Sequence, residues 1–342
     1  MADLNSLCAL GEIYSRQTLF IVLSIVKCVI TGIGCLSLGF VYFRQRVISM
    51  FHPNARLIFK LHVTFLVLTM IGTFMCDGGT ILHFTLLKWM SKDSACPVHP
   101  ISPFWMLTRF AVRTGCEGVT YTATAWIFER IYATVLIGSY EKKNTTIGWV
   151  FCLASIACAV GAAIVRAKLG DYSLPMAIMR MPETTYNFNM VVTHICATLE
   201  FLNVIAVLVL LMVNQQRLRK TETIECSLTS KYQIRENVQA SALIFPLAML
   251  QCISFLPSDT IIPFVTKNTT FYERTTTYAN AEWVCVYFVT LPLCLWWRNR
   301  AQTSLVRSLE QNNRIGRKYE NDRKEGEMET AKYFEMFNKM VA

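Results

Sequence analysis

Long apolar runs separated by short polar segments dominate the pattern along the chain. A transmembrane helix needs about 20 predominantly apolar residues. Seven stretches meet this requirement, at 18–43, 57–87, 103–128, 147–165, 190–213, 240–265 and 278–297. A polar stretch, ECSLTSKYQIRENVQ, separates the fifth run from the sixth. The pattern predicts an all-α membrane protein built as a seven-transmembrane helix bundle.

The composition supports this interpretation. Hydrophobic residues make up 53% of the 342 residues and charged residues only 16%, which lies outside the usual range of soluble domains. We divide the chain into an extracellular segment (1–17), the seven-helix bundle (18–297), a short amphipathic helix on the inner leaflet (298–311) and a charged cytoplasmic tail (312–342). The first run has no evident cleavage site after it, so we interpret it as an uncleaved anchor.

The positions of Lys and Arg predict the orientation, because these residues are enriched in cytoplasmic loops. With the N-terminus outside, the cytoplasmic segments hold 22 of the 33 Lys and Arg residues, and the outer segments hold eight, Arg166 among them. We therefore expect a multi-pass protein of the plasma membrane with a cytoplasmic C-terminus. The net charge of +10 then reflects this bias and not a nucleic-acid partner. Of the two NTT sequons, only Asn268 would lie outside and be glycosylated.

The cysteines predict one candidate disulfide. Ten of the 13 lie in the apolar runs, where a lone Cys packs as a small apolar residue. Cys8 and Cys96 fall in outer segments, where disulfides persist, and would join the N-terminal segment to the outer end of the third run. No paired Cys or His spacing, phosphate-binding loop or catalytic dyad occurs in the sequence, so we predict no metal site, no cofactor and no enzymatic activity.

Charged residues within the runs indicate a ligand pocket in the outer half of the bundle, because such charges are costly and usually face its interior. The candidates are Lys27, Asp77, Arg109, Arg113, Glu117, Glu200, Asp259 and Glu282. Matching their depths pairs Lys27 with Asp77. It pairs Arg113 with either Glu117 or Glu200, and Arg109 with Asp259. Three bases and five acids leave a balance of minus two, which favours a cationic or hydrogen-bond-rich ligand; alternatively, the pairs only hold helices together around an apolar pocket.

A second candidate site lies at the inner end of the third run, where Glu129 and Arg130 are followed by Tyr132. An acid beside an arginine can pair locally and release the guanidinium when a neighbouring helix moves. A simple interfacial pair is the alternative. The predicted partners begin the sixth helix on the cytoplasmic side and are Tyr232, Gln233, Arg235, Glu236 and Asn237.

The segments ERIYAT and SLTSKYQIREN together resemble the signature pair of the nematode serpentine chemoreceptors of the Sra superfamily. The matching residues are Glu129, Arg130, Ala133, Thr134, Ser227, Leu228, Tyr232, Gln233, Glu236 and Asn237. The epsilon and alpha/beta classes both fit. The resemblance implies a G-protein-coupled receptor for a small environmental chemical, present in sensory cilia and partnered by a heterotrimeric G protein. A seven-span ligand-gated channel or transporter that uses the charges within the runs is the alternative.

Overall fold

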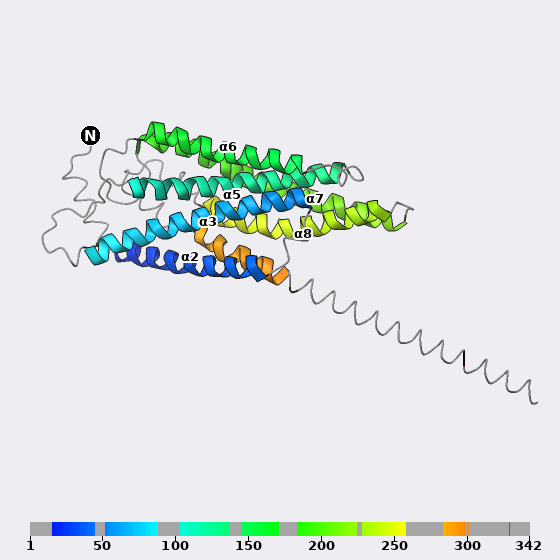
Figure 1. Cartoon of the computed structure of the whole chain (residues 1–342), viewed down its shortest axis with the longest axis horizontal. Helices are drawn as coiled ribbons and strands as arrows, with labels where there is room; N and C mark the ends of the chain where they lie inside the picture. The colour runs from blue at the N-terminus through cyan, green and yellow to red at the C-terminus, as the bar shows by residue number, and fades with distance from the viewer. Residues whose placement is uncertain are drawn as a thin grey trace, which may run out of the picture. The chain divides into compact units, whose positions relative to one another are not determined.

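The computed structural model describes residues 16–44, 52–87, 103–136, 145–170, 183–223, 228–257 and 283–298, together with residues 300 and 328. Every regular element in these ranges is helical. The elements are α2 (Thr18–Arg44), α3 (Pro53–Ile81), its π-helical continuation η2 (Leu82–Leu87), α5 (Pro103–Val135), α6 (Thr146–Leu169), the 3-10 turn η3 (Glu183–Thr185), α7 (Tyr186–Thr223) and α8 (Leu228–Leu256). A last helix covers Val284–Arg298. The predicted all-α bundle of seven helices is thus confirmed (Figure 1).

Five of these helices, α2, α3, α6, α7 and α8, are long and apolar enough to cross a membrane. The last helix is apolar but shorter. Helix α5 is long enough but carries charges, and Arg109, Glu117, Glu129 and Arg130 are all buried. Because these charges face the interior of the bundle, they do not prevent α5 from spanning the membrane.

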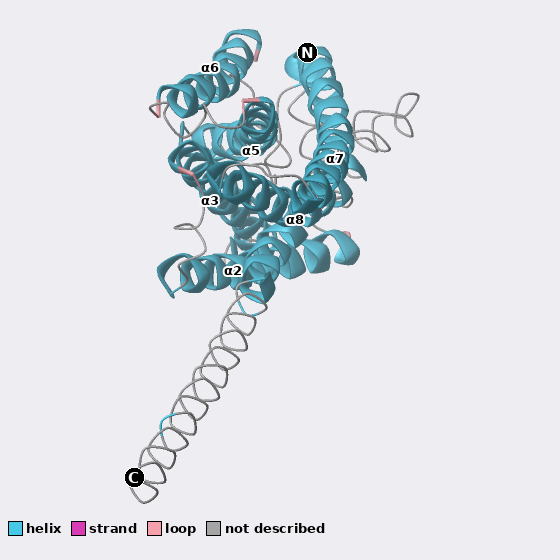
Figure 2. Ribbon diagram, turned by 90° about the vertical axis from the view of Figure 1, so that its right-hand side faces the viewer, coloured by secondary structure: helices cyan, strands magenta, loops and turns pink. Residues whose placement is uncertain are grey.

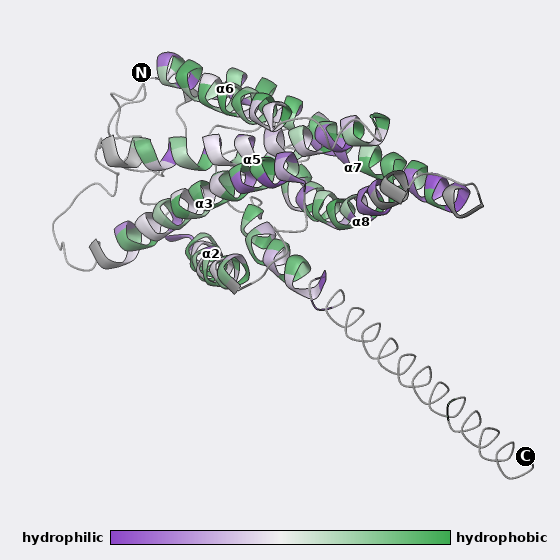
Figure 3. Cartoon of the chain, turned by 45° about the vertical axis from the view of Figure 1, so that its right-hand side comes forward, coloured by the Kyte–Doolittle hydropathy of each residue, from purple (hydrophilic) through white to green (hydrophobic). Residues whose placement is uncertain are grey.

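Apolar side chains cover the outer faces of the helices. On α2, for example, Leu36 is 78% exposed and Phe43 is 88% exposed. A soluble protein does not leave so many large apolar groups in water, whereas lipid tails solvate them. In Figure 3 the apolar positions run along the helices, and polar positions gather where α7 ends and α8 begins.

Helix α5 forms the centre of the bundle. It packs against α3, α6, α7 and α8, and α3 packs in turn against α2 and α6 (Figure 2). The last helix contacts α2, where a Cβ added to Gly34 would lie 2.7 Å from the Cβ of Phe288. It also contacts α8, where the rings of Phe255 and Tyr287 meet edge to face with centroids 5.9 Å apart.

Glycines allow α3 and α5 to approach closely. A Cβ added to Gly72 of α3 would lie 2.7 Å from the Val112 side chain, and one added to Gly115 of α5 would lie 2.8 Å from the backbone nitrogen of Thr69. Small residues at helix interfaces bring backbones together and so increase van der Waals contact, which is a main source of helix association in lipid. The α3–α5 contact is therefore a packed interface with no room for a side chain at these positions.

The chain divides into two compact units, Met1–Cys294 and Leu295–Ala342. The first unit contains the helix bundle up to Cys294. In the second unit the guanidinium carbon of Arg300 lies 4.8 Å from the ring centroid of Trp296, which is cation–π distance. Apart from residues 298, 300 and 328, the predicted amphipathic helix (298–311) and tail (312–342) lie outside the described residues.

Candidate functional site

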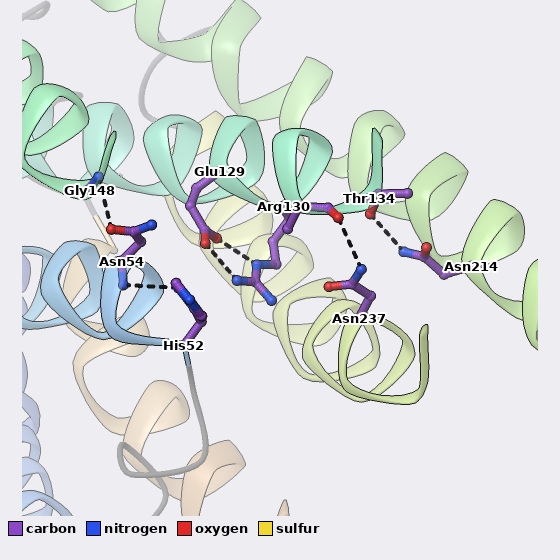
Figure 4. A network of polar contacts seen from close by, with 9 residues as sticks. His52, Asn54, Glu129, Arg130, Thr134, Gly148, Asn214 and Asn237 are labelled. Atoms are coloured by element: carbon purple, nitrogen blue, oxygen red, sulfur yellow. Dashed lines mark hydrogen bonds and ion pairs between the residues drawn. The ribbon is translucent and has the colours of Figure 1, made fainter. Parts of the chain in front are cut away.

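The predicted charge pair at the end of α5 forms within the helix. The Nε and Nη2 of Arg130 each donate a hydrogen bond of 2.6 Å to a different carboxylate oxygen of Glu129 (Figure 4). Glu129 is fully buried and Arg130 is 2% exposed. A bidentate contact neutralises both groups, which burial requires because an unpaired charge in this environment is costly. The pair therefore keeps the guanidinium charge at this end of the bundle locally compensated.

Side chains from α7 and α8 bind the last turn of α5 next to this pair. The Nδ2 of Asn237 on α8 lies 3.5 Å from the Ala133 backbone oxygen. On α7, Asn214 donates to the Thr134 hydroxyl (3.2 Å) and Arg217 donates to the Thr134 backbone oxygen (2.5 Å). The last four carbonyls of a helix lack partners within the helix. Here the neighbouring helices supply donors to them, which ties α7 and α8 to the end of α5.

A third contact joins α3 to α6 at the same end of the bundle. The Gly148 nitrogen of α6 donates to the Oδ1 of Asn54 (3.3 Å), and the backbone nitrogen of Asn54 donates to the Nδ1 of His52 (3.4 Å; Figure 4). Asn54 is fully buried, and Pro53 occupies the first helical position, where its missing N–H costs nothing. These contacts, together with those around Arg130, form a polar layer that we call the Arg130 end.

A second polar cluster lies on the same helix, α5, about three turns before Arg130. The Nη1 of Arg166 on α6 donates to Glu117 at 3.0 Å, and its Nη2 donates to the other oxygen of that carboxylate. Its Nε donates to the Oδ1 of Asn189 on α7 (2.6 Å), and Asn189 in turn donates to the Thr185 hydroxyl (2.9 Å). Arg166 is 1% exposed. The cluster joins α5, α6 and α7 through one guanidinium.

Nearly the whole chain matches one known protein family. Residues 7–342 match the model described as "Serpentine type 7TM GPCR receptor class ab chemoreceptor". The chain belongs to this family. The match favours the alpha/beta class over the epsilon class. A similar protein, "Serpentine receptor class beta-16" of Caenorhabditis elegans, is 20% identical over 207 residues, which are 60% of this chain and 58% of that protein. The chain thus spans less than two thirds of that relative's length.

The residues predicted to couple the receptor to a G protein differ in their burial. Gln233 and Asn237 are one turn apart on α8 and both are buried, whereas Arg235 is exposed. Glu236 and, on α5, Tyr132 are half-buried. The side chain of Tyr232 lies outside the described part of the chain. The predicted contact between Arg130 and α8 near Tyr232 or Glu236 stays a prediction.

The predicted pocket residues that the structure describes are distributed over four helices. Lys27 of α2 is buried, and its Nζ lies 6.0 Å from the ring centroid of Trp283. The adjacent Cys28 approaches Gly78 of α3, so Asp77 lies beside the same part of α2, and its pairing with Lys27 stays a prediction. Asp259 and Glu282 lie outside the described residues, as do Cys8, Cys96 and Asn268.

Helices α5 and α7 share further buried polar contacts between the two clusters. Thr120 donates to a carboxylate oxygen of Glu200 (2.9 Å), and Asn203 donates to the Thr124 hydroxyl (2.9 Å). Arg109 is buried and Arg113 is half-buried on the same face of α5. Within the described ranges no three His, Cys, Asp or Glu side chains are grouped so that they could hold a metal ion.

One prediction about the charges is corrected by the structure. Arg166 was assigned to an outer segment because the fourth apolar run ends at residue 165, yet α6 continues to Leu169 and buries it. Arg166 is the bidentate partner of Glu117, a role that the depth argument had offered to Arg113. A basic residue one turn before the end of an apolar helix ordinarily extends toward water, so nothing in the sequence indicated that Arg166 faces Glu117.

Proposed function

We propose that this chain is a G-protein-coupled chemosensory receptor of the plasma membrane, with its N-terminus outside. A small environmental ligand binds between the helices in the outer half of the bundle, and a heterotrimeric G protein is activated at the Arg130 end. The observation that carries the proposal is the buried Glu129–Arg130 pair, placed where α7 and α8 bind the last turn of α5.

The contacts at the Arg130 end favour a two-state mechanism. A ligand changes the conformation only if it binds one arrangement of the helices better than the other. In the arrangement described here, Glu129 holds the Arg130 guanidinium, and Asn237 contacts the neighbouring turn of α5. A movement of α8 would break the Asn237 contact and expose the pair, so that the guanidinium becomes available to the G protein.

The charges of the bundle bear on the ligand. Arg166 counts as a fourth base within the spans, which changes the balance from minus two to minus one. Because Glu117 is neutralised by Arg166, we assign this carboxylate to holding α5 against α6 and not to contacting the ligand. The hydrogen-bonding groups of α5 and α7 around Glu200 suit a small ligand with polar atoms.

The test is a ligand screen in cells that carry a promiscuous G protein, with each variant compared at equal surface amount. Arg130→Ala should preserve ligand binding and abolish G-protein activation, because it removes the guanidinium that the proposed mechanism makes available to the G protein. Arg130→Lys keeps the charge but not the bidentate fork and should recover little. Lys60→Ala is the matched control, since Lys60 is an exposed base on α3, about two turns from the Asn54 contact at the Arg130 end.

A ligand-gated channel or transporter gives a different result in the same cells. Its current would depend on the charges within the spans and would persist when G-protein signalling is blocked. A response of unchanged size in Arg130→Ala, with and without the block, would contradict the receptor proposal.

A further inference from the structure

A buried chain of hydrogen bonds joins the last helix to the centre of the bundle. The Nδ1 of His62 on α3 lies 3.0 Å from the Thr122 hydroxyl of α5, and its Nε2 lies 3.2 Å from the Tyr287 hydroxyl of the last helix. All three side chains are buried. None of them belongs to the predicted pocket or to the Arg130 end.

The hydroxyl of Thr122 determines the direction of this chain. A threonine has one hydroxyl proton, and Thr122 donates it to the Gly118 backbone oxygen at 2.6 Å. Thr122 therefore accepts from His62, whose proton lies on Nδ1. In a neutral imidazole the other nitrogen is an acceptor, so Tyr287 donates to Nε2. With the opposite direction the Tyr287 proton would lack an acceptor, since within the described ranges its hydroxyl contacts only His62.

Tyr287 also contacts the helix that the proposed mechanism moves. Its ring meets Phe255 of α8 edge to face, with the ring planes 88° apart, and it meets the His62 ring with the planes 84° apart. Tyr287 thus lies between α3 and α8. A displacement of α8 or of the last helix that shifts Tyr287 would leave the Nε2 of His62 buried without its donor, which is costly.

We propose that His62 is a positioning residue that holds Tyr287 and the last helix in the resting arrangement and thereby sets the receptor's basal activity. The proposal rests on the proposed function. It assigns His62 a neutral state with the proton on Nδ1. It also assigns a donor and an acceptor to each hydrogen bond of the series, which runs from Tyr287 through His62 and Thr122 to the backbone of α5.

The first test removes the Tyr287 donor with Tyr287→Phe, which keeps the ring and its contact with Phe255. One net hydrogen bond lost from the resting arrangement should raise basal G-protein activation about fivefold per receptor at the surface. Tyr42→Phe is the matched control, because Tyr42 is exposed on α2 and, among the described residues, its ring meets that of its neighbour Phe43. It should leave basal activation unchanged.

Two amide variants of His62 test the positioning role from the other partner of the same hydrogen bond, and also cover the case that Tyr287→Phe does not reach the surface. His62→Asn places a donor near Thr122 but offers no acceptor to Tyr287, and should raise basal activation as Tyr287→Phe does. His62→Gln can accept from Tyr287 and should stay closer to wild type. The double variant of His62→Asn and Tyr287→Phe should not exceed either single variant, because both remove the same bond.

A spectroscopic readout makes the result independent of signalling. In the full chain labelled with 15N-histidine, the signal that disappears in His62→Asn should show a neutral ring with its proton on Nδ1. A proton on Nε2 would overturn the assigned direction. Glu129→Gln is the positive control, because it loosens the hold on the Arg130 guanidinium and should raise basal activation. Basal activation of Tyr287→Phe equal to wild type, while Glu129→Gln raises it, would overturn the positioning role. If no variant activates a G protein, Glu129→Gln included, the proposed function and the positioning role that rests on it both fail, and the 15N spectrum still decides the hydrogen-bond chain.

Discussion

The Glu117–Arg166 pair offers the most quantitative test of how the bundle is held together. Arg166→Met keeps an unbranched apolar stem but removes the guanidinium, so the Glu117 carboxylate loses both charge-assisted hydrogen bonds while remaining buried. It also removes the donor to Asn189. Breaking a buried ion pair from one side costs about 3–5 kcal/mol. We expect the lower half of this range, because Arg113 lies one turn from Glu117 on α5 and offers a second positive charge.

The assay is thermal unfolding of the purified full chain in detergent. At about 2 °C per kcal/mol for a chain of this size, Arg166→Met should lower Tm by about 6–8 °C. Glu117→Leu should have a similar effect, because it strands the arginine. The double variant should recover most of the loss, since replacing both partners by apolar groups is often nearly neutral. Lys168→Met is the matched control, because Lys168 is exposed two residues further along α6.

Two results would refute this reasoning. If Arg166→Met melts within about 1 °C of wild type, the contact contributes nothing and the carboxylate is stabilised in another way. If the double variant loses the sum of the two single losses, the two residues act independently and the pair is not coupled.

Three further predictions follow from the packing and the predicted topology. Gly115→Ala places a Cβ 2.8 Å from the backbone nitrogen of Thr69 and should cost about 1–3 kcal/mol of stability in the same assay. By contrast, Gly161→Ala should be neutral, because beyond the local backbone of α6 the added Cβ meets no described atom within 4 Å. The predicted pairing of Lys27 with Asp77 implies that Lys27→Leu strands the carboxylate and reduces the amount of receptor at the cell surface, with partial recovery when Asp77→Asn is added; a single variant that reaches the surface normally but loses its ligand response makes these residues pocket groups instead. A mass shift that glycosidase removes should vanish with Asn268→Gln, and a shift that survives this change would reverse the predicted orientation.

The spans were predictable because the property that defines them is local. Some 20 apolar residues cross a bilayer wherever the other helices lie, so the first run, 18–43, differs from α2 by one residue at its end. The predicted end of α5 was less accurate, because the third run ends at residue 128 but the helix continues to Val135. Hydropathy underestimates such a helix, because Glu129 and Arg130 satisfy one another and remain buried despite their charge.

The partners of the charged residues were not predictable in the same way. Depth along a helix gives one coordinate of a side chain, and several acids shared the depth of Arg113, so the choice between Glu117 and Glu200 stayed open. The direction in which Arg166 points depends on how α6 packs against α5, which no local pattern encodes. The same holds for Asn214, whose amide reaches the Thr134 hydroxyl of another helix, and for Asn237, whose amide reaches the Ala133 backbone oxygen. Neither contact leaves a signal in the sequence of either segment.

The central claim is that the Arg130 end activates a G protein and that the Glu129–Arg130 pair restrains this activity. The most direct measurement uses the full chain in lipid vesicles and needs no ligand: nucleotide exchange on an added G protein and ion flux across the same vesicles, for wild type, Glu129→Gln and Arg130→Ala. The account predicts that Glu129→Gln accelerates exchange above wild type, that Arg130→Ala reduces it to the level of empty vesicles, and that no variant carries flux. Flux that all three proteins share, with exchange no faster than in empty vesicles, would contradict it.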